Sequence, residues 1–274
     1  MNERLKQKIY NYWNRQTCGT IHTRQPKHSK SYFEEIEAYR YSVEPEIFSF
    51  AQFTRMYGQR VLEVGIGAGT DFIQWVRSSA QTTGLDLTWE AIENTRHRLD
   101  VYGLKAHLIQ GDCEHLAFAN DSFDLVYSWG VIHHTPDTWR ALDEIIRVCR
   151  PGGSCKLMLY NRHSVAALTV WLEFCLITGQ PWHSLSWALW HHMESLGTKA
   201  FTPAEVEAHL KARGIRRPVV RSKPTHYDRP QSTGPLKSRW LRLVSLILAT
   251  VLGWRKAGWF ITIEFQKSPM EHGI

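Results

Sequence analysis

Short apolar runs alternate with amphipathic helical segments between residues 60 and 160. The runs are rich in β-branched residues and predict buried strands: RVLEVG (60–65), TTGLDL (82–87), AHLIQGD (106–112), FDLVYSWG (123–130) and SCKLMLY (154–160). Helices are expected between them over 70–79, 88–103 and 136–150, with Thr88 capping the second and Gly103 ending it. This alternation predicts right-handed βαβ units and a parallel sheet.

The flanks are mainly helical in pattern. Residues 2–57 predict helices interrupted at Pro45, with Ser31 as a possible cap. Residues 163–200 predict further helices, and TPAEVEAHLKARG (202–214) has the pattern of a capping box. Two more strands are expected at 217–223 and 259–267, with a loop at 224–235. We therefore expect one α/β domain, in which 1–57 form a helical cap, 58–161 the core, and 162–274 substrate-side helices and final strands.

The strongest chemical signal is the glycine turn VLEVGIGAGTD (61–71). Gly65, Gly67 and Gly69 lie between a predicted strand and a predicted helix, where glycines let the backbone approach a nucleotide closely. Asp86 ends the next strand 21 residues after Gly65, where a carboxylate can accept hydrogen bonds from both ribose hydroxyls. The spacing also suits NAD, but an acid at Asp71 beside the helix start opposes a phosphate.

Four segments in the same order carry a family resemblance: VLEVGIGAGTD, GLDLT, GDCEHLAFANDSFDLVYSWGVIHHTPD and RVCRPGG, over residues 58–161. Together they resemble the class I S-adenosylmethionine-dependent methyltransferases, in particular the small-molecule group that includes the quinone and sterol methyltransferases. The resemblance implies a Rossmann-like, mostly parallel seven-stranded sheet with helices on both faces, an N-terminal helical lid and inserted substrate-side helices. It also implies S-adenosyl-L-methionine as cofactor and S-adenosyl-L-homocysteine as product.

The resemblance implies a role for each matching position. The glycines Gly65, Gly67 and Gly69 would border the cofactor, Glu63 would order its methionine end, and Asp86 with Leu87 would hold the ribose. Asp112 would face the adenine amino group, with Cys113 and Glu114 beside the ring, and Ser128 and Trp129 would lie near the sulfonium. The alternatives remain that Glu63 is simply a strand-end acid and Asp112 a turn or cap residue.

His133 and His134 follow the fourth predicted strand, at the edge where doubly wound sheets bind ligands. Either histidine could act as a catalytic base, with His133 slightly preferred; the alternative is a loop or packing role. No metal site is expected, because adjacent side chains diverge and no third ligand is evident.

Two groups of aromatic and charged residues outside the core also attract interest. Tyr39, Arg40 and Tyr41 could belong to a lid over the cofactor or substrate. Trp171, Trp182, Trp187 and Trp190 could line an aromatic cavity, although ordinary core packing is the default interpretation.

Charge is concentrated in the last part of the chain. The net charge is +7, yet the segment from Lys199 onward holds 14 Lys or Arg and 5 Asp or Glu. Nucleic acid, anionic lipid or an acidic substrate could meet this region, but an ordinary solvated surface is preferred and nucleic acid is disfavoured, because no nucleic-acid-binding motif accompanies the charge. The apolar runs 165–178 and 240–254 are shorter than the roughly 20 residues of a spanning helix, and buried or lid helices are expected there. The segment 236–256 could also lie on a membrane surface.

The five scattered cysteines and the polar N-terminus predict a reduced, cytoplasmic protein. The expected function is methyl transfer to an oxygen, nitrogen or carbon of a small molecule by direct in-line displacement. The alternatives are a lipid or quinone-type acceptor, and a nucleic acid or protein acceptor. The last is disfavoured because SWGVIHH lacks the N/D-P-P-Y/F pattern. A binding protein with an inactive cofactor fold is disfavoured by the intact glycines and Asp86. Oligomeric state stays open.

Overall fold

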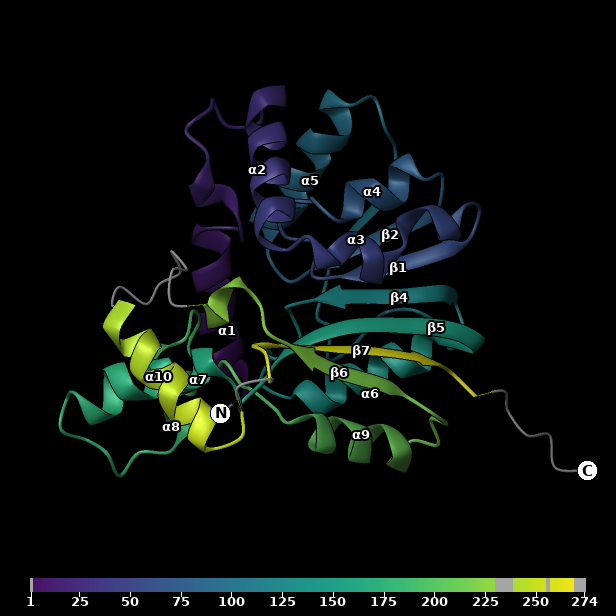
Figure 1. Ribbon diagram of the computed structural model, residues 1–274. Helices are drawn as coiled ribbons and strands as arrows, with labels where there is room; N and C mark the ends of the chain where they lie inside the picture. Colours follow the sequence, from purple (N-terminus) through teal and green to yellow (C-terminus); the bar gives the residue numbers. More distant parts are fainter. Residues whose placement is uncertain (1, 230–238, 255–256, 269–274) are drawn as a thin grey trace, which may run out of the picture.

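A single seven-stranded sheet organises the chain (Figure 1). The computed structural model describes residues 2–229, 239–254 and 257–268. The strands are β1 (Arg60–Val64), β2 (Gln81–Asp86), β3 (His107–Gln110), β4 (Phe123–Trp129), β5 (Cys149–Tyr160), β6 (Val219–Lys223) and β7 (Phe260–Gln266). Their order is β3-β2-β1-β4-β5-β7-β6, and only β7 runs antiparallel to its neighbours. The expected mostly parallel α/β fold is confirmed, including the final strand pair.

Apolar clusters on both faces of the sheet hold it between helices. The helices that alternate with the strands are α4 (Phe72–Arg77), α5 (Trp89–Val101), α6 (Thr138–Val148) and α9 (Pro203–Ala212). Leu62 and Val64 of β1 join the cluster that contains Leu142 and Ile145 of α6, whereas Val61 joins the cluster on the other face. The strands are therefore buried on both sides, as their continuous apolar sequences indicate.

The helix caps expected from the sequence are largely present. The Thr88 hydroxyl accepts from the Ala91 amide at the start of α5, and Thr202 and Glu205 form the capping box of α9. Asp137 caps α6, which begins at Thr138 rather than at Pro136. Before α2, Ser29 and not Ser31 is the cap, because its hydroxyl accepts from the Tyr32 amide.

The N-terminal helices are α1 (Asn2–Arg15), η1 (Thr20–His22), α2 (Lys30–Val43), α3 (Glu46–Ala51) and η2 (Phe53–Met56). Of these, α1 and α2 lie toward the carboxyl ends of the strands, whereas α3 lies over a face of the sheet and the chain continues from it into β1 (Figure 1). The chain turns at Pro45, which lies between α2 and α3 as predicted. Both α1 and α2 contact α5, so the cap region packs directly on the core.

A second helical group follows β5 at the same end of the sheet (Figure 1). It contains α7 (Val165–Trp171), a π-helical turn η3 (Leu172–Leu176), α8 (Leu185–His192) and α10 (Arg239–Val251). The short turn η4 (His226–Asp228) contacts α7. Among the helices that the structure describes, none has the length and apolar character needed to cross a membrane. Lys237, Arg255 and Lys256, which belong to the basic flanks of 236–256, lie outside the described residues.

Candidate functional site

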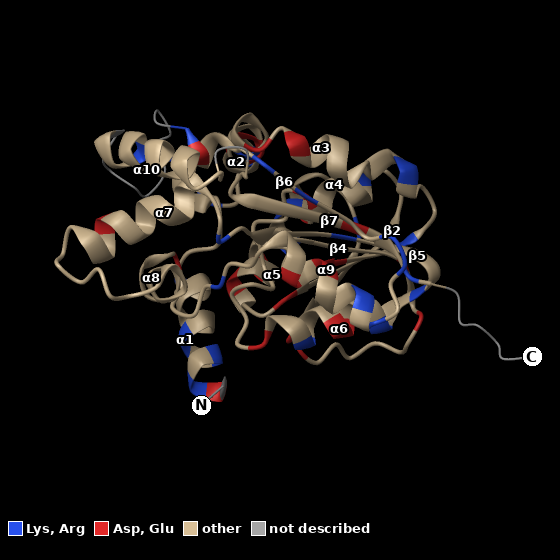
Figure 2. Cartoon of the chain, turned by 60° about the horizontal axis from the view of Figure 1, so that its bottom comes forward, with Lys and Arg blue, Asp and Glu red and all other residues tan. Residues whose placement is uncertain are grey.

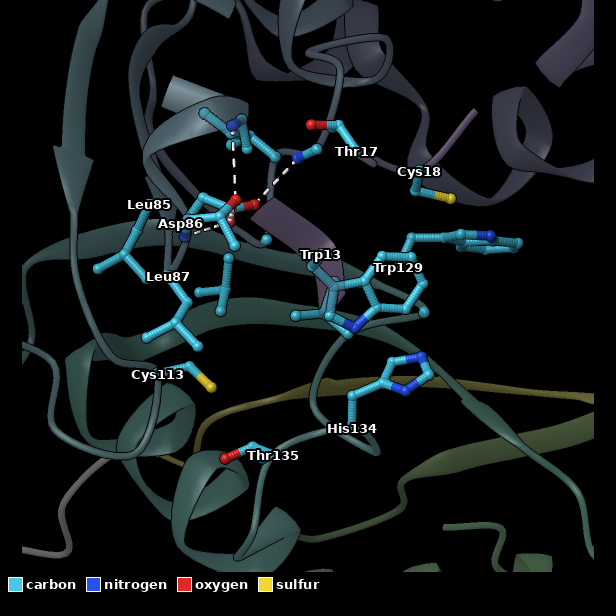
Figure 3. A pocket seen from close by; sticks show the side chains of 18 of the residues that line it. Trp13, Thr17, Cys18, Leu85, Asp86, Leu87, Cys113, Trp129, His134 and Thr135 are labelled. Carbon is cyan, nitrogen blue, oxygen red and sulfur yellow. Dashed lines mark hydrogen bonds between the residues drawn. The ribbon is translucent and has the colours of Figure 1, made fainter. Parts of the chain in front are cut away.

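A deep cleft opens at the carboxyl ends of β1, β2, β4 and β5, and α1 covers part of it (Figure 3). The empty space in and above it, open mouth included, is about 1200 Å³. Of the residues expected at a site, the cleft is lined by Glu63, Gly65, Gly67, Asp86, Leu87, Asp112, Cys113, Trp129 and His134. Gly69, Glu114, Ser128 and His133 do not line it, and each has a different place in the fold.

The glycine turn between β1 and α4 forms one wall. Gly67 has φ +52°, and a Cβ built there would meet only Thr17 Cγ2, 3.9 Å away, so its backbone is open to the cleft. At Gly65 a Cβ would lie 2.3 Å from Val131, so glycine is required for the loop after β4 to pack over the turn. Gly69 instead packs on α5, where its Cβ would lie 2.8 Å from Thr95 Oγ1. One glycine thus admits a ligand and two allow close packing.

Asp86, at the end of β2, is held in place by three hydrogen bonds (Figure 3). Its Oδ2 accepts from the Gly67 amide at 3.1 Å, and its Oδ1 accepts from the Thr88 amide and hydroxyl at 2.9 and 2.8 Å. Burial raises the pKa of Asp86, while these donors oppose the shift. A carboxylate has about four acceptor positions. Three are occupied, so one position remains for a ligand hydroxyl in the cleft, and a second hydroxyl would share or replace one of the present donors.

The far end of this wall carries a lysine from α1. Lys6 Nζ lies 2.6 Å from Asp112 Oδ2 and 3.0 Å from Glu114 Oε2. Burial raises the pKa of Asp112, but Lys6, the Glu114 amide and His115 outweigh this and hold it below its usual value. Glu114 itself turns away from the cleft, because it accepts from the Thr135 hydroxyl and the Asp137 amide. An adenine amino group at this position would donate to Asp112, which also accepts from Lys6.

Asp112, Glu114 and His115 also bring three ligand atoms within 4.8 Å of one another. The Lys6 ammonium already bonds to both carboxylates of this group. Their geometry is therefore explained by an ion pair that ties α1 to the end of β3.

An acidic cluster surrounds Arg40 at the opposite end of the cleft. Arg40 makes a two-point contact with Asp71, through Nε at 3.2 Å and Nη2 at 3.0 Å, and its Nη1 lies 3.7 Å from Glu44. Glu63 accepts from Trp75 Nε1 at 2.8 Å. Burial and the Asp71 charge raise the pKa of Glu63 well above its ordinary value. A raised pKa favours the neutral form of Glu63, so the ion pairs at this end are those of Arg40 with Asp71 and Glu44.

Trp129 and Ser128, at the end of β4, differ in what they contact. Trp129 lines the cleft, and its Nε1 donates to Glu44 Oε2 at 2.6 Å, which fixes the indole over the acidic cluster. Ser128 donates to the Val64 carbonyl at 3.0 Å and is buried between β4 and β1. The expected sulfonium position therefore has Trp129 beside it, and Ser128 serves to join two strands.

The two adjacent histidines point in different directions. His134 lines the cleft: its Nδ1 lies 3.0 Å from Thr198 Oγ1 and 3.1 Å from Ser195 Oγ, and its Nε2 lies 3.3 Å from Glu194 Oε2. His133 is fully buried and packs on Tyr160 with ring centroids 3.9 Å apart. Neither of its ring nitrogens has a hydrogen-bond partner in the described part of the chain. The slight preference for His133 is therefore corrected in favour of His134, because only His134 can reach a ligand.

Comparison with known proteins identifies the cofactor-binding core. Residues 61–153 match the family described as Methyltransferase domain. A phthiotriol/phenolphthiotriol dimycocerosates methyltransferase of Mycobacterium leprae is 40% identical over 98 residues, which is 35% of this chain and 36% of that protein. This chain carries a class I, S-adenosylmethionine-dependent methyltransferase domain. The match covers about a third of the length of the curated relatives, so the resemblance is confined to that domain.

Solved structures agree with this methyltransferase fold over most of the chain. A putative methyltransferase of Haloferax volcanii, solved with the Trm112 activator, aligns with 88% of this chain and 98% of its own at a TM-score of 0.59 and 21% identity. Phospholethanolamine N-methyltransferase 2 of Haemonchus contortus was solved with phosphomonomethylethanolamine and S-adenosylhomocysteine. It aligns with 95% of this chain and 60% of its own, at a TM-score of 0.61 and a sequence identity of 14%. At these identities the likeness establishes the fold.

Several lining residues of the methyltransferase cleft were not predicted as site residues. They are Lys6, Ile9, Trp13, Thr17 and Cys18 from the N-terminal region, Tyr160 from the end of β5, and Glu194 from beyond the core. Arg40, proposed only as part of a lid, does line the cleft. The proposed aromatic cavity of Trp171, Trp182, Trp187 and Trp190 is not found there; Trp182 is 73% exposed, and the tryptophans of the cleft are Trp13 and Trp129.

The buried His133 gives a prediction for pH dependence. Burial, with the charges of His134 and Lys199, lowers its pKa well below 6.5. Below that pH the unfolded chain binds a proton that folded His133 does not, so this residue makes the protein less stable as pH falls. The slope is at most about 1.4 kcal/mol per pH unit. His133→Phe is expected to remove that slope and to change stability at neutral pH by about 1 kcal/mol or less, since it removes two unpaired buried nitrogens.

Urea unfolding of both proteins between neutral pH and pH 5 measures this difference. Other groups titrate in the same range, but they are common to both proteins and cancel in the comparison. Parallel stability curves for the wild type and His133→Phe would show that His133 is not buried in its neutral form.

Proposed function

We propose that this protein transfers a methyl group from S-adenosylmethionine to an oxygen, nitrogen or carbon atom of a small-molecule acceptor. The observation that carries the proposal is that one cleft joins Asp86 and Gly67 at one end to the His134 and Glu194 pair at the other. A cofactor held by the first group would present its reactive end toward the second. A direct transfer requires that both reactants be held side by side in one site.

The residues of the cleft fit this cofactor in charge and shape. Asp86 would accept from its two ribose hydroxyls, Gly67 leaves space for its nucleoside, and Asp112, Leu87 and Cys113 would surround its adenine. Arg40 would pair with its carboxylate, and the acids around Arg40 suit its two positive groups. When bound, S-adenosylmethionine supplies an electrophilic methyl group on a cationic sulfur, which an acceptor takes by direct in-line displacement.

The chain contributes positioning, exclusion of water and a proton acceptor. Trp13 from α1 packs its edge against His134 with ring centroids 5.1 Å apart, and so shields the transfer position from solvent. Tyr160 donates to Glu194 Oε2 at 3.0 Å, and His134 Nε2 contacts the same oxygen. This pair would take the proton that a hydroxyl, amine or acidic carbon loses on methylation. Glu194 also adopts a left-handed backbone with φ +49°, which is common where a side chain is held for function.

A lipid or quinone-type acceptor is the second candidate for this site. Ile9, Trp13, Trp129 and Val131 give the cleft an apolar lining beside its polar groups. The Mycobacterium leprae relative is itself named for a dimycocerosate acceptor, although the similarity covers only about a third of each chain. An acceptor with a polar reacting atom on an apolar body would satisfy both parts of the cleft.

Calorimetry with S-adenosylmethionine, S-adenosylhomocysteine and NAD tests the proposal. We expect heat of binding from the first two only, and unfolding free energy raised by about 2.7 kcal/mol at a ligand concentration one hundred times Kd. Transfer of a labelled methyl group to pooled phenols, amines, quinones and lipids then identifies the acceptor. Binding of NAD with no heat from S-adenosylhomocysteine would refute the assignment.

A further inference from the structure

The C-terminal helix α10 is oriented with its apolar stripe facing solvent. Trp240, Leu243, Val244, Ile247, Leu248 and Val251 recur at helical spacing, and their exposed fractions run from 36% to 79%. On its inner face Arg242, Ser245 and Ala249 are nearly fully buried, and Leu241 and Leu246 pack beside them against α7. An amphipathic helix of a free-standing domain normally buries its apolar stripe and exposes its polar face. In α10 a broad apolar stripe is exposed, while the polar side chains of Arg242 and Ser245 are buried.

Specific polar contacts hold α10 in this orientation. Ser245 hydrogen-bonds with Thr169 of α7 at 2.8 Å. Arg242 donates to the Tyr227 carbonyl in η4, and Ala249 packs into an apolar cluster with Leu168 and Leu172. A rotation of α10 that buried its apolar stripe would break these contacts and turn Arg242 and Ser245 toward solvent. The outward stripe is therefore fixed by the packing of the inner face.

Neighbouring residues enlarge the apolar surface. The turn η3, which contacts α10, exposes Leu176 at 47%, and the segment after it exposes Ile177 and Trp182 at 65% and 73%. We define the outer face of α10 as Trp240, Leu243, Val244, Ile247, Leu248 and Val251. A monomeric soluble domain seldom leaves so many large apolar side chains together in water. Something is expected to cover them.

We propose that the outer face of α10 docks on the surface of an anionic membrane. The helix has 13 residues, too few to span a bilayer but enough to lie in the headgroup region with Trp240 at the interface. It contains no Asp or Glu, and Figure 2 shows no red on it. In the sequence it is flanked by Lys237, Arg239, Arg255 and Lys256. Apolar residues between basic ends match the acyl boundary and negative headgroups of such a surface.

The charges also favour a membrane over a second copy of this chain. Both sequence flanks of α10 are basic, so pairing two copies through this helix, parallel or antiparallel, would bring like charges together. An anionic bilayer compensates these charges at both ends. Docking concerns where the protein works, and it does not require the acceptor to be a lipid or the proposed methyl transfer to be correct.

Co-sedimentation with vesicles tests the docking. The full chain is mixed with vesicles of phosphatidylcholine plus phosphatidylglycerol, and separately with phosphatidylcholine alone. We expect binding to the anionic vesicles only, weakened by added salt because the basic residues are screened. Ile247→Glu combined with Val251→Glu should weaken this binding at least about tenfold, since two inserted apolar side chains are replaced by charges that the bilayer repels.

Tyr57→Glu is the matched control, because Tyr57 is 74% exposed and precedes β1 at the other edge of the sheet. It should bind vesicles like the wild type, and all variants should bind S-adenosylhomocysteine with equal heat. That last readout separates the docking from the proposed function. Wild-type protein that stays in the supernatant, or Ile247→Glu with Val251→Glu that still sediments, would overturn the proposal. So would light scattering that shows a dimer broken by the same substitutions without any vesicle binding.

Discussion

Asp86→Ala is expected to weaken the binding of S-adenosylhomocysteine by about a hundredfold or more. The loss removes two charge-assisted hydrogen bonds to ribose, each contributing about 1.5–3 kcal/mol. It also frees the Gly67 amide and the Thr88 hydroxyl, which Asp86 now holds at 3.1 and 2.8 Å. The glycine turn would therefore lose the hydrogen bond between the Gly67 amide and Asp86, in addition to the bonds that Asp86 makes to the ligand. Isothermal calorimetry measures this change directly.

Two further variants separate a ligand role of Asp86 from a structural one. Asp86→Asn keeps the shape and one acceptor oxygen, so its affinity should lie between those of the wild type and Asp86→Ala. Asp100→Ala removes an exposed carboxylate from the end of α5 and should bind as the wild type does. Asp86→Ala that folds normally and binds with unchanged affinity would refute the assigned role.

The core of this site was predictable because its signals are local. Gly67 and Asp86 each follow a strand that is recognisable from a few apolar residues, and parallel strands bring their carboxyl ends to one edge. The expected order of strands and helices was therefore confirmed.

Residues outside the core could not be found in this way. Lys6 and Trp13 reach the cleft only because α1 folds back over an edge formed about a hundred residues later, and no short motif records that contact. Glu194 likewise depends on how the segment after α8 packs against Tyr160. Such contacts are decided by tertiary packing between distant segments, which periodicity and spacing do not describe.

The sequence also did not determine in which direction particular side chains point. His133 and His134 are adjacent, and the turn in which the His134 amide donates to the Val131 carbonyl decides which ring enters the cleft. The stripe of α10 could be recognised from its spacing, but its outward orientation follows from the bonds of Arg242 and Ser245. In both cases the sequence shows which residues are neighbours or share a helix face, but it does not show what their side chains contact.

His134→Ala is expected to lower kcat for methyl transfer by about a hundredfold and to change the affinity for S-adenosylhomocysteine by less than about threefold. General-base catalysis typically contributes 10²–10⁴-fold. His134 lies at the acceptor end of the cleft, with Thr198, Ser195 and Glu194 as its partners, and away from Asp86 and Asp112. Removing it should therefore slow proton removal without disturbing the nucleoside wall.

Glu194→Gln provides the companion measurement, because the amide keeps the size of the side chain but cannot accept a proton as the carboxylate does. A shared role predicts that each single variant loses most of the activity and that the double variant loses little more, since residues acting as a unit are not additive. His191→Ala is the control: His191 is an exposed residue of α8 and its Nδ1 lies 2.8 Å from the Trp187 carbonyl oxygen. If His134→Ala retained full kcat with an acceptor that must lose a proton, the His134 and Glu194 pair would not be the base. The cleft would then act through positioning alone, as the near-attack arrangement of two bound reactants permits.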